Sequence, residues 1–143
     1  MDLNINFFFE DTTEPALDYK KIKSWLSLLI HNHNFILEEL NYILCSDDYL
    51  LEVNKEHLNH DYYTDIITFD NSDTKQTIES DIFVSIDRIE DNAKVLNQDF
   101  QKETLRVLSH GVLHLLGFKD KSDKDAKEMR KQEDSAIELY YKN

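Results

Sequence analysis

The chain has 143 residues, of which 41% are hydrophobic and 31% charged, a composition typical of one globular domain and unlike that of a disordered protein. Its formal net charge of −13 argues against non-specific binding to nucleic acid, DNA included, because such binding needs a basic surface. The apolar runs are too short to span a bilayer, no basic leader opens the chain, and the single cysteine, Cys45, allows no internal disulfide. We therefore expect a cytoplasmic protein that does not contact a membrane.

The predicted elements follow from two apolar spacings. Alternating apolar and polar side chains, as in residues 39–45, indicate half-buried strands, whereas the spacing in residues 19–34 indicates a helix. In chain order the prediction is a strand at 3–7, a helix at 19–34, a strand at 39–45, a helix at 46–57, strands at 65–69 and 81–86, and helices at 87–96, 102–116 and 122–141. No repeat or linker divides the chain, so residues 1–143 are predicted to form a single α/β (α+β) domain with about four strands and five helices.

Charge is distributed unevenly along the chain. Residues 102–131 hold eight basic and five acidic side chains, a net charge of +3 within an acidic protein. A solvated helix with paired charges is the favoured interpretation. The basic excess nevertheless lies beside the most unusual motif of the sequence.

That motif, from Ser109 to Lys121, holds both glycines of the chain and two of its six histidines. His110 and His114 are four residues apart on the predicted helix, so both rings project from one face and can share a metal ion. Gly117 follows the last apolar residue, where a left-handed C-cap would turn the chain and bring Asp120 toward the rings. These two nitrogens and one carboxylate oxygen leave a fourth zinc position open for water, as in catalytic sites. We therefore predict one Zn²⁺ on a helix and its turn, held by His110, His114 and Asp120.

Gly111 lies inside the predicted helix, where glycine costs roughly 1 kcal/mol relative to alanine. Either close helix packing or room beside the metal for a bulky substrate would explain it, and the second interpretation is favoured. Zinc peptidases with a His-Glu-x-x-His motif carry their catalytic glutamate at this place. A peptidase would therefore lack its general base here.

The motif resembles the signature of the YbeY family of bacterial endoribonucleases, also called ribosomal RNA maturation factors. That signature runs His-Gly-x-Leu-His-Leu-x-Gly-Tyr-Asp-His, and residues 110–120 read His-Gly-Val-Leu-His-Leu-Leu-Gly-Phe-Lys-Asp. Upstream, Thr-Asp-Ile-Ile-Thr-Phe at residues 64–69 is similar to the family's Thr-Asp-Val-Leu-Ser-Phe, and residues 80–82 are similar to its Gly-Asp-Ile. The resemblance implies a mixed-sheet α/β fold, one zinc-like ion and cleavage of single-stranded RNA. It further implies work on the 3′ end of small-subunit ribosomal RNA and in ribosome quality control, with the small subunit and its proteins as partners.

Two places depart from the family pattern. The third ligand is Asp120 rather than histidine, and a carboxylate is an accepted zinc ligand. The family usually has an arginine, suited to contact with phosphate, where this chain has Leu58. Arg106, one helical turn before His110 and on the same face, is predicted to replace it in catalysis, with a surface salt bridge as the alternative.

Two further acids are candidates for catalytic roles. Asp65 and Asp81 begin adjacent predicted strands and could orient a metal ligand or place the attacking water, although capping or hydrogen bonding is slightly favoured for each. In the loop before Asp65, stacking of Tyr62 or Tyr63 on an RNA base is favoured over a second metal site at His57 and His60.

Together these observations predict a metal-dependent endoribonuclease in which an activated water attacks a phosphodiester. Two alternatives stay open. One is a zinc hydrolase of another class that shares the two-histidine helix. The other is a non-catalytic ribosome-assembly factor with a structural zinc, which the net charge and Leu58 both favour.

Overall fold

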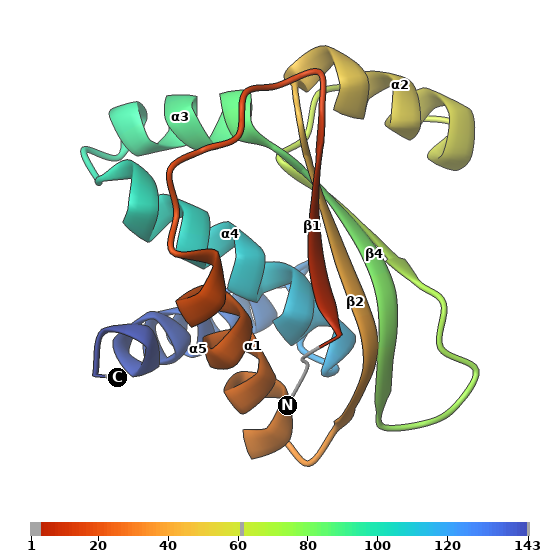
Figure 1. The fold of residues 1–143 in the computed structure, drawn as a ribbon, viewed down its shortest axis with the longest axis vertical. Coiled ribbons are helices and arrows are strands. Elements are labelled where there is room, and N and C mark those ends of the chain that lie inside the picture. Colours follow the sequence, from red (N-terminus) through yellow and green to blue (C-terminus); the bar gives the residue numbers. More distant parts are fainter. Residues whose placement is uncertain (1–3, 61, 143) are drawn as a thin grey trace.

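A four-stranded sheet with helices against both of its faces forms the fold (Figure 1). The computed structural model describes residues 4–60 and 62–142. Along the chain these residues form β1 (Ile5–Glu10), α1 (Tyr19–Asn32), β2 (Ile36–Cys45), α2 (Asp47–Leu58), β3 (Ile66–Asp70), β4 (Thr77–Ser85), α3 (Ile86–Val95), α4 (Phe100–Leu115) and α5 (Asp123–Lys142). The predicted α/β class and the order of elements are confirmed.

The sheet is mixed. Its spatial order is β1-β2-β4-β3, with β1 parallel to β2, β2 parallel to β4, and β3 antiparallel to β4. Parallel neighbours need a crossover, and α1 supplies the connection between β1 and β2. The antiparallel pair β3–β4 is joined by a short polar loop, and this pair carries the face on which α4 lies.

Two strands begin earlier than predicted. β2 starts at Ile36 and β4 at Thr77, whereas alternation alone placed their starts at residues 39 and 81. Residues 77–80 pair with residues 36–40 of β2 in a parallel register with one irregularity, so the polar side chains there belong to a strand. The predicted strand start at Leu3 lies outside the described residues.

The main core lies between the sheet and the layer of α1, α4 and α5 (Figure 1). On the opposite face α2 covers one end of the sheet with Leu50 and Val53, which pack near Cys45 and Ile67. Cys45 is fully buried, and burial raises the pKa of its thiol to about 12. Cys45 is therefore a small side chain of the core, and its thiol lacks the environment of a reactive nucleophile.

Gly111 brings α4 close to the sheet. A Cβ atom built at Gly111 would lie 3.0 Å from Cδ1 of both Ile66 and Ile82. The glycine is buried and faces the strands, so close helix packing explains it. These contacts support close packing rather than the favoured interpretation, room for a substrate beside the metal. A second link between the layers is the buried Tyr42 hydroxyl, which donates to the Leu108 carbonyl at 2.7 Å.

Within the described residues no helix is long and apolar enough to cross a membrane.

Candidate active site

The turn after α4 is built as the sequence predicts. Gly117 has φ +108°, a conformation that suits glycine. Its N–H donates to His114 O at 3.1 Å and the Phe118 N–H donates to Leu113 O at 3.1 Å, the two hydrogen bonds of a Schellman cap. The reversed chain then brings Asp120 back to α4.

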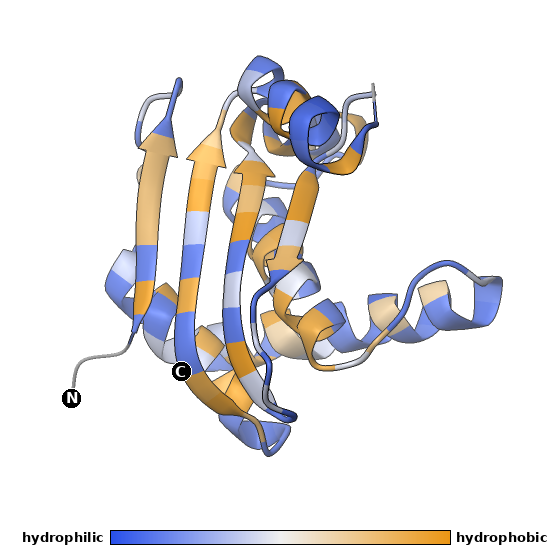
Figure 2. Ribbon diagram, turned by 90° about the vertical axis from the view of Figure 1, so that its right-hand side faces the viewer, coloured by the Kyte–Doolittle hydropathy of each residue, from blue (hydrophilic) through white to orange (hydrophobic). Residues whose placement is uncertain are grey.

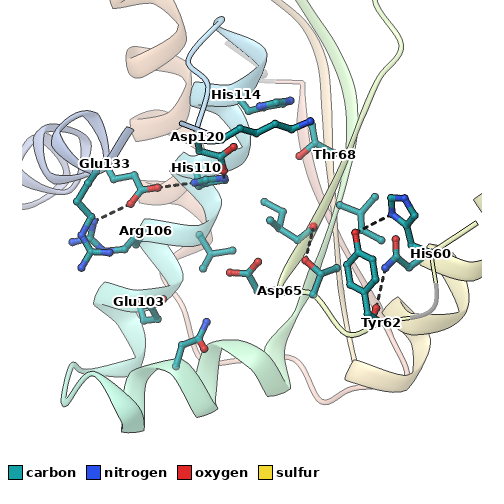
Figure 3. Close-up of a pocket in the computed structure, with 18 of the residues that line it drawn as sticks. His60, Tyr62, Asp65, Thr68, Glu103, Arg106, His110, His114, Asp120 and Glu133 are labelled. Atoms are coloured by element: carbon teal, nitrogen blue, oxygen red, sulfur yellow. Dashed lines mark hydrogen bonds and ion pairs between the residues drawn. The ribbon is translucent and has the colours of Figure 1, made fainter. Parts of the chain in front are cut away.

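His110 is held on both sides of its ring (Figure 3). Its Nε2 lies 3.2 Å from Asp120 Oδ2, and its Nδ1 lies 2.7 Å from Glu133 Oε2 on α5. An ionised carboxylate only accepts hydrogen bonds, so Nδ1 carries the proton in this pair. This hydrogen bond raises the pKa of His110 above its ordinary value, and burial partly offsets the rise.

The donor atoms at His110 and Asp120 suit a metal ion. Two ligands of a tetrahedral zinc ion with bonds of about 2.05 Å lie about 3.3 Å apart. The observed separation of 3.2 Å between Nε2 and Oδ2 matches this value. A carboxylate on the other ring nitrogen, here Glu133, is the usual partner of a metal-bound histidine. The positions of His110 and Asp120, two of the three predicted ligands, therefore fit a zinc ion.

His114 is exposed and lies one turn beyond His110, with both rings on the cleft side of α4 (Figure 3). Within the described residues, however, no three His, Cys, Asp or Glu side chains are gathered closely enough to count as a metal-binding cluster. The structure thus brings His110 and Asp120 into contact and places His114 beside them.

These residues line a cleft of about 770 Å³. Its walls come from the end of α2, the segment before β3, β3 itself, the end of α3, and the facing sides of α4 and α5. Besides three histidines, its lining includes the carboxylates Asp65, Glu103, Asp120 and Glu133 and the cations Arg106, Lys121 and Arg130. The predicted metal ligands thus open onto a space large enough for a nucleotide segment.

Arg106 lines the cleft but is ion-paired on both sides. Its Nη1 lies 3.0 Å from Glu133 Oε1 and its Nη2 lies 2.7 Å from Asp134 Oδ1. Its side chain is only 13% exposed. The salt-bridge alternative therefore describes Arg106, although the bridge to Glu133 is buried rather than on the surface.

Asp65 faces the interior of the cleft and lies on the side opposite Glu133 (Figure 3). Burial raises the pKa of its carboxyl group, and the nearby His110 partly offsets the rise. The predicted placement of Asp65 beside the metal ligands is thus compatible with this geometry.

Asp81 lies elsewhere, outside the residues that line the cleft. Its neighbour Ile82 faces Gly111 on α4, and successive side chains of a strand point to opposite faces, so Asp81 points away from α4. There its carboxylate accepts hydrogen bonds from Asn41 at 3.0 Å and Asn71 at 3.2 Å. Figure 2 shows the hydrophilic band that crosses the strands. The predicted catalytic role of Asp81 needs correction, because this position favours its hydrogen-bonding alternative.

The far wall of the cleft carries an aromatic pair. The rings of His60 and Tyr62 stack with centroids 5.1 Å apart, and the Tyr62 hydroxyl lies 2.9 Å from His60 Nδ1. Leu58, at the place of the family arginine, also lines this wall and is 39% exposed. Tyr62 therefore lies at the cleft, but its ring stacks on His60. That Tyr62 stacks on an RNA base stays a prediction.

Two acidic residues of the cleft, Glu133 and Glu103, escaped the sequence-based prediction. Both are 5% exposed and lie among the mostly apolar buried side chains of α5 and α4. An acid at a buried helical position is rare unless it has a partner. An acid in a mostly apolar helical pattern could therefore have marked both residues from the sequence. The pattern does not reveal which side chains pair with them.

Comparison with known proteins gives the same family as the motif. A sequence model described as endoribonuclease YbeY matches residues 7–141. The chain is 50% identical over 135 residues to the Endoribonuclease YbeY of Cytophaga hutchinsonii, covering 94% of each chain. It is 49% identical over 138 residues to that of Flavobacterium johnsoniae, covering 96% of this chain and 97% of the other.

A solved structure supports the fold. The solution structure of a Thermotoga maritima protein, 27% identical, matches with a TM-score of 0.68 and covers 94% of this chain and 89% of the other. A match of the family model to nearly the whole chain, together with relatives half identical to it, establishes the relationship. The chain belongs to the endoribonuclease YbeY family.

Proposed function

We propose that this protein is a zinc-dependent endoribonuclease that cleaves single-stranded ribosomal RNA during maturation of the small-subunit 3′ end and in ribosome quality control. Membership in the endoribonuclease YbeY family makes it a hydrolase of RNA phosphodiester bonds. The finer proposal adds the metal, the ribosomal substrate, the small subunit and its proteins as partners, and a cytoplasmic location. Neither DNA nor a membrane is among the proposed partners.

One observation supports the site above all others. His110 directs Nε2 toward Asp120 while Glu133 holds its Nδ1. In the proposed site His110, His114 and Asp120 hold one Zn²⁺ through two nitrogens and one carboxylate oxygen. When bound, the ion would polarise a phosphoryl oxygen and activate a water as hydroxide near neutral pH.

The surrounding residues prepare this site. Glu133 accepts the Nδ1 proton of His110, so that Nε2 would be the nitrogen available to the ion beside Asp120. Arg106 neutralises Glu133 inside the protein, and its predicted contact with phosphate would require it to leave that carboxylate. Asp65, half-buried at the cleft, is proposed to position the attacking water. Asp81 supports no step of this mechanism.

The proposal is tested with wild-type protein and two histidine variants. His114→Ala removes a proposed ligand, whereas His31→Ala removes an exposed histidine of α1 that does not line the cleft. Bound metal is measured by mass spectrometry, and cleavage is measured on a labelled single-stranded ribosomal RNA fragment. We expect wild type and His31→Ala to carry about one metal ion and to cut, and His114→Ala to lose both properties.

Two outcomes would contradict the proposal in different ways. Wild-type protein that binds metal but never cuts, even with small subunits present, would favour the metal-stabilised assembly factor. Cleavage that survives in metal-free protein would remove zinc from the mechanism.

A further inference from the structure

The cleft has a shortage of available positive charge. Its lining has four carboxylates against three cations, a formal charge of −1 when the histidines are neutral. A single-stranded RNA carries one negative charge per phosphate, and most of its affinity for proteins comes from cations that contact these phosphates. Besides the proposed Zn²⁺, binding of this substrate therefore calls for a cation of the protein that is not already paired.

Arg106 is not that cation. Its two ion pairs, at 3.0 Å to Glu133 and 2.7 Å to Asp134, occupy both terminal nitrogens. Moving Arg106 onto a phosphate would leave the buried carboxylate of Glu133 without its guanidinium partner and with only His110 beside it, which is costly in a protein interior. The pairing also ties Arg106 to the carboxylate that holds His110.

Arg130 is placed differently. It lines the same cleft and is exposed, and within the described residues it forms neither an ion pair nor a side-chain hydrogen bond. On α5 it precedes Glu133 by three residues, so it lies on the same helix face one turn closer to the turn that carries Asp120. Its charge already acts inside the cleft. Burial raises the pKa of Glu103, and Arg106 and Arg130 both act to lower it.

We propose that Arg130 contacts the phosphate backbone of single-stranded RNA in the cleft and holds it beside His110 and Asp120. The inference rests on the proposed function and names one of its binding residues. A guanidinium group suits this role because its planar fork can hold two oxygens of one phosphate. The third cation of the lining, Lys121, adjoins Asp120 and offers only a point charge.

The test compares Arg130→Gln with Lys131→Gln, which makes the same charge change at an exposed neighbour outside the cleft. Affinity for a labelled single-stranded 2′-O-methyl RNA, checked for integrity afterwards, is measured by fluorescence anisotropy at several salt concentrations. We expect Arg130→Gln to weaken binding about tenfold, as expected for the loss of a hydrogen bond to a charged group. The slope of log K against log salt should fall by about 0.7, the value for one phosphate contact on a single strand.

A conservative variant sharpens the result. Arg130→Lys should restore the salt slope, because lysine carries the same charge. It should restore only part of the affinity, because lysine lacks the planar fork of the guanidinium group. Lys131→Gln should match wild type in both measures. If Arg130→Gln behaves like Lys131→Gln while wild type binds and cuts RNA, the inference is wrong and the proposed function stands. If wild type neither binds nor cuts single-stranded RNA, the proposed function and the inference fail together.

Discussion

Glu133 uses both oxygens of one carboxylate to organise the site. Oε2 accepts from His110 and Oε1 pairs with Arg106, and the side chain is only 7% exposed. A buried carboxylate of this kind fixes the tautomer of a metal-binding histidine and is itself stabilised by the guanidinium. At the residue scale, the position of His110 therefore depends on a partner 23 residues further along the chain.

This dependence predicts the effect of Glu133→Gln. The amide keeps an acceptor for His110 but removes the charge, so the affinity for Zn²⁺ should fall about 10–100-fold. Asp134→Asn is the matched control, because Asp134 pairs with Arg106 and does not touch His110. Zinc affinity is measured by competition with a chelator, and the tautomer of His110 by NMR of its ring nitrogens. Equal zinc affinities in the two variants would mean that Glu133 has only a structural role.

At the element scale, the spacing of α4 from the sheet depends on one missing side chain. A larger residue at Gly111 must displace Ile66 and Ile82, because their Cδ1 atoms would lie only 3.0 Å from its Cβ atom. We expect Gly111→Leu to lower the free energy of unfolding by about 1–3 kcal/mol, the usual cost of overpacking a core. Urea denaturation of the metal-free protein measures this. A variant as stable as wild type but unable to bind RNA would instead support the interpretation that the glycine makes room for substrate.

The sequence predicts best what is local. The spacing of His110, His114 and Gly117 lies within one helix and its cap, so their arrangement follows from helical geometry. The partnership of His110 with Glu133 does not, because it requires knowing how α4 and α5 pack. Asp81 is the converse case, a residue that the sequence placed at the site and the structure places elsewhere. It begins a predicted strand beside Asp65, but the two-residue period of the strand turns its side chain to the other face of the sheet.

The strand boundaries have a similar explanation. Residues 77–80 precede the strand predicted to start at residue 81, yet they pair with β2 as its parallel neighbour. A polar side chain such as Glu79 fits there because α2 covers only one end of that face. The alternation that marks a strand is weakest where one face is polar and the other is partly covered. Tertiary pairing therefore decides where β4 begins.

At the scale of the whole molecule, the burial of an acid in the cleft makes stability depend on pH. The chain has a net charge of −13. One of its acids, Glu103, lines the cleft from the first turn of α4 and is only 5% exposed. Burial raises the pKa of Glu103 above its ordinary 4.5, while Arg106 acts to lower it. A carboxyl group that is harder to ionise in the folded state binds more protons there than in the unfolded chain. Its ionisation therefore reduces stability as the pH rises.

This sign predicts the behaviour of Glu103→Gln. Below the ordinary carboxyl pKa, where both states are protonated, the variant and wild type should have equal stability, because glutamine resembles the neutral acid. Once the pH exceeds the raised pKa of the folded state, the variant should be more stable, with a melting temperature a few degrees higher. The exposed acid Glu128 provides the control, since Glu128→Gln should leave that pH dependence unchanged. Thermal unfolding followed from about pH 4 to about pH 8 measures the difference. A wild-type protein that gains stability over Glu103→Gln as the pH rises would show that Arg106 and Arg130 outweigh the burial of Glu103.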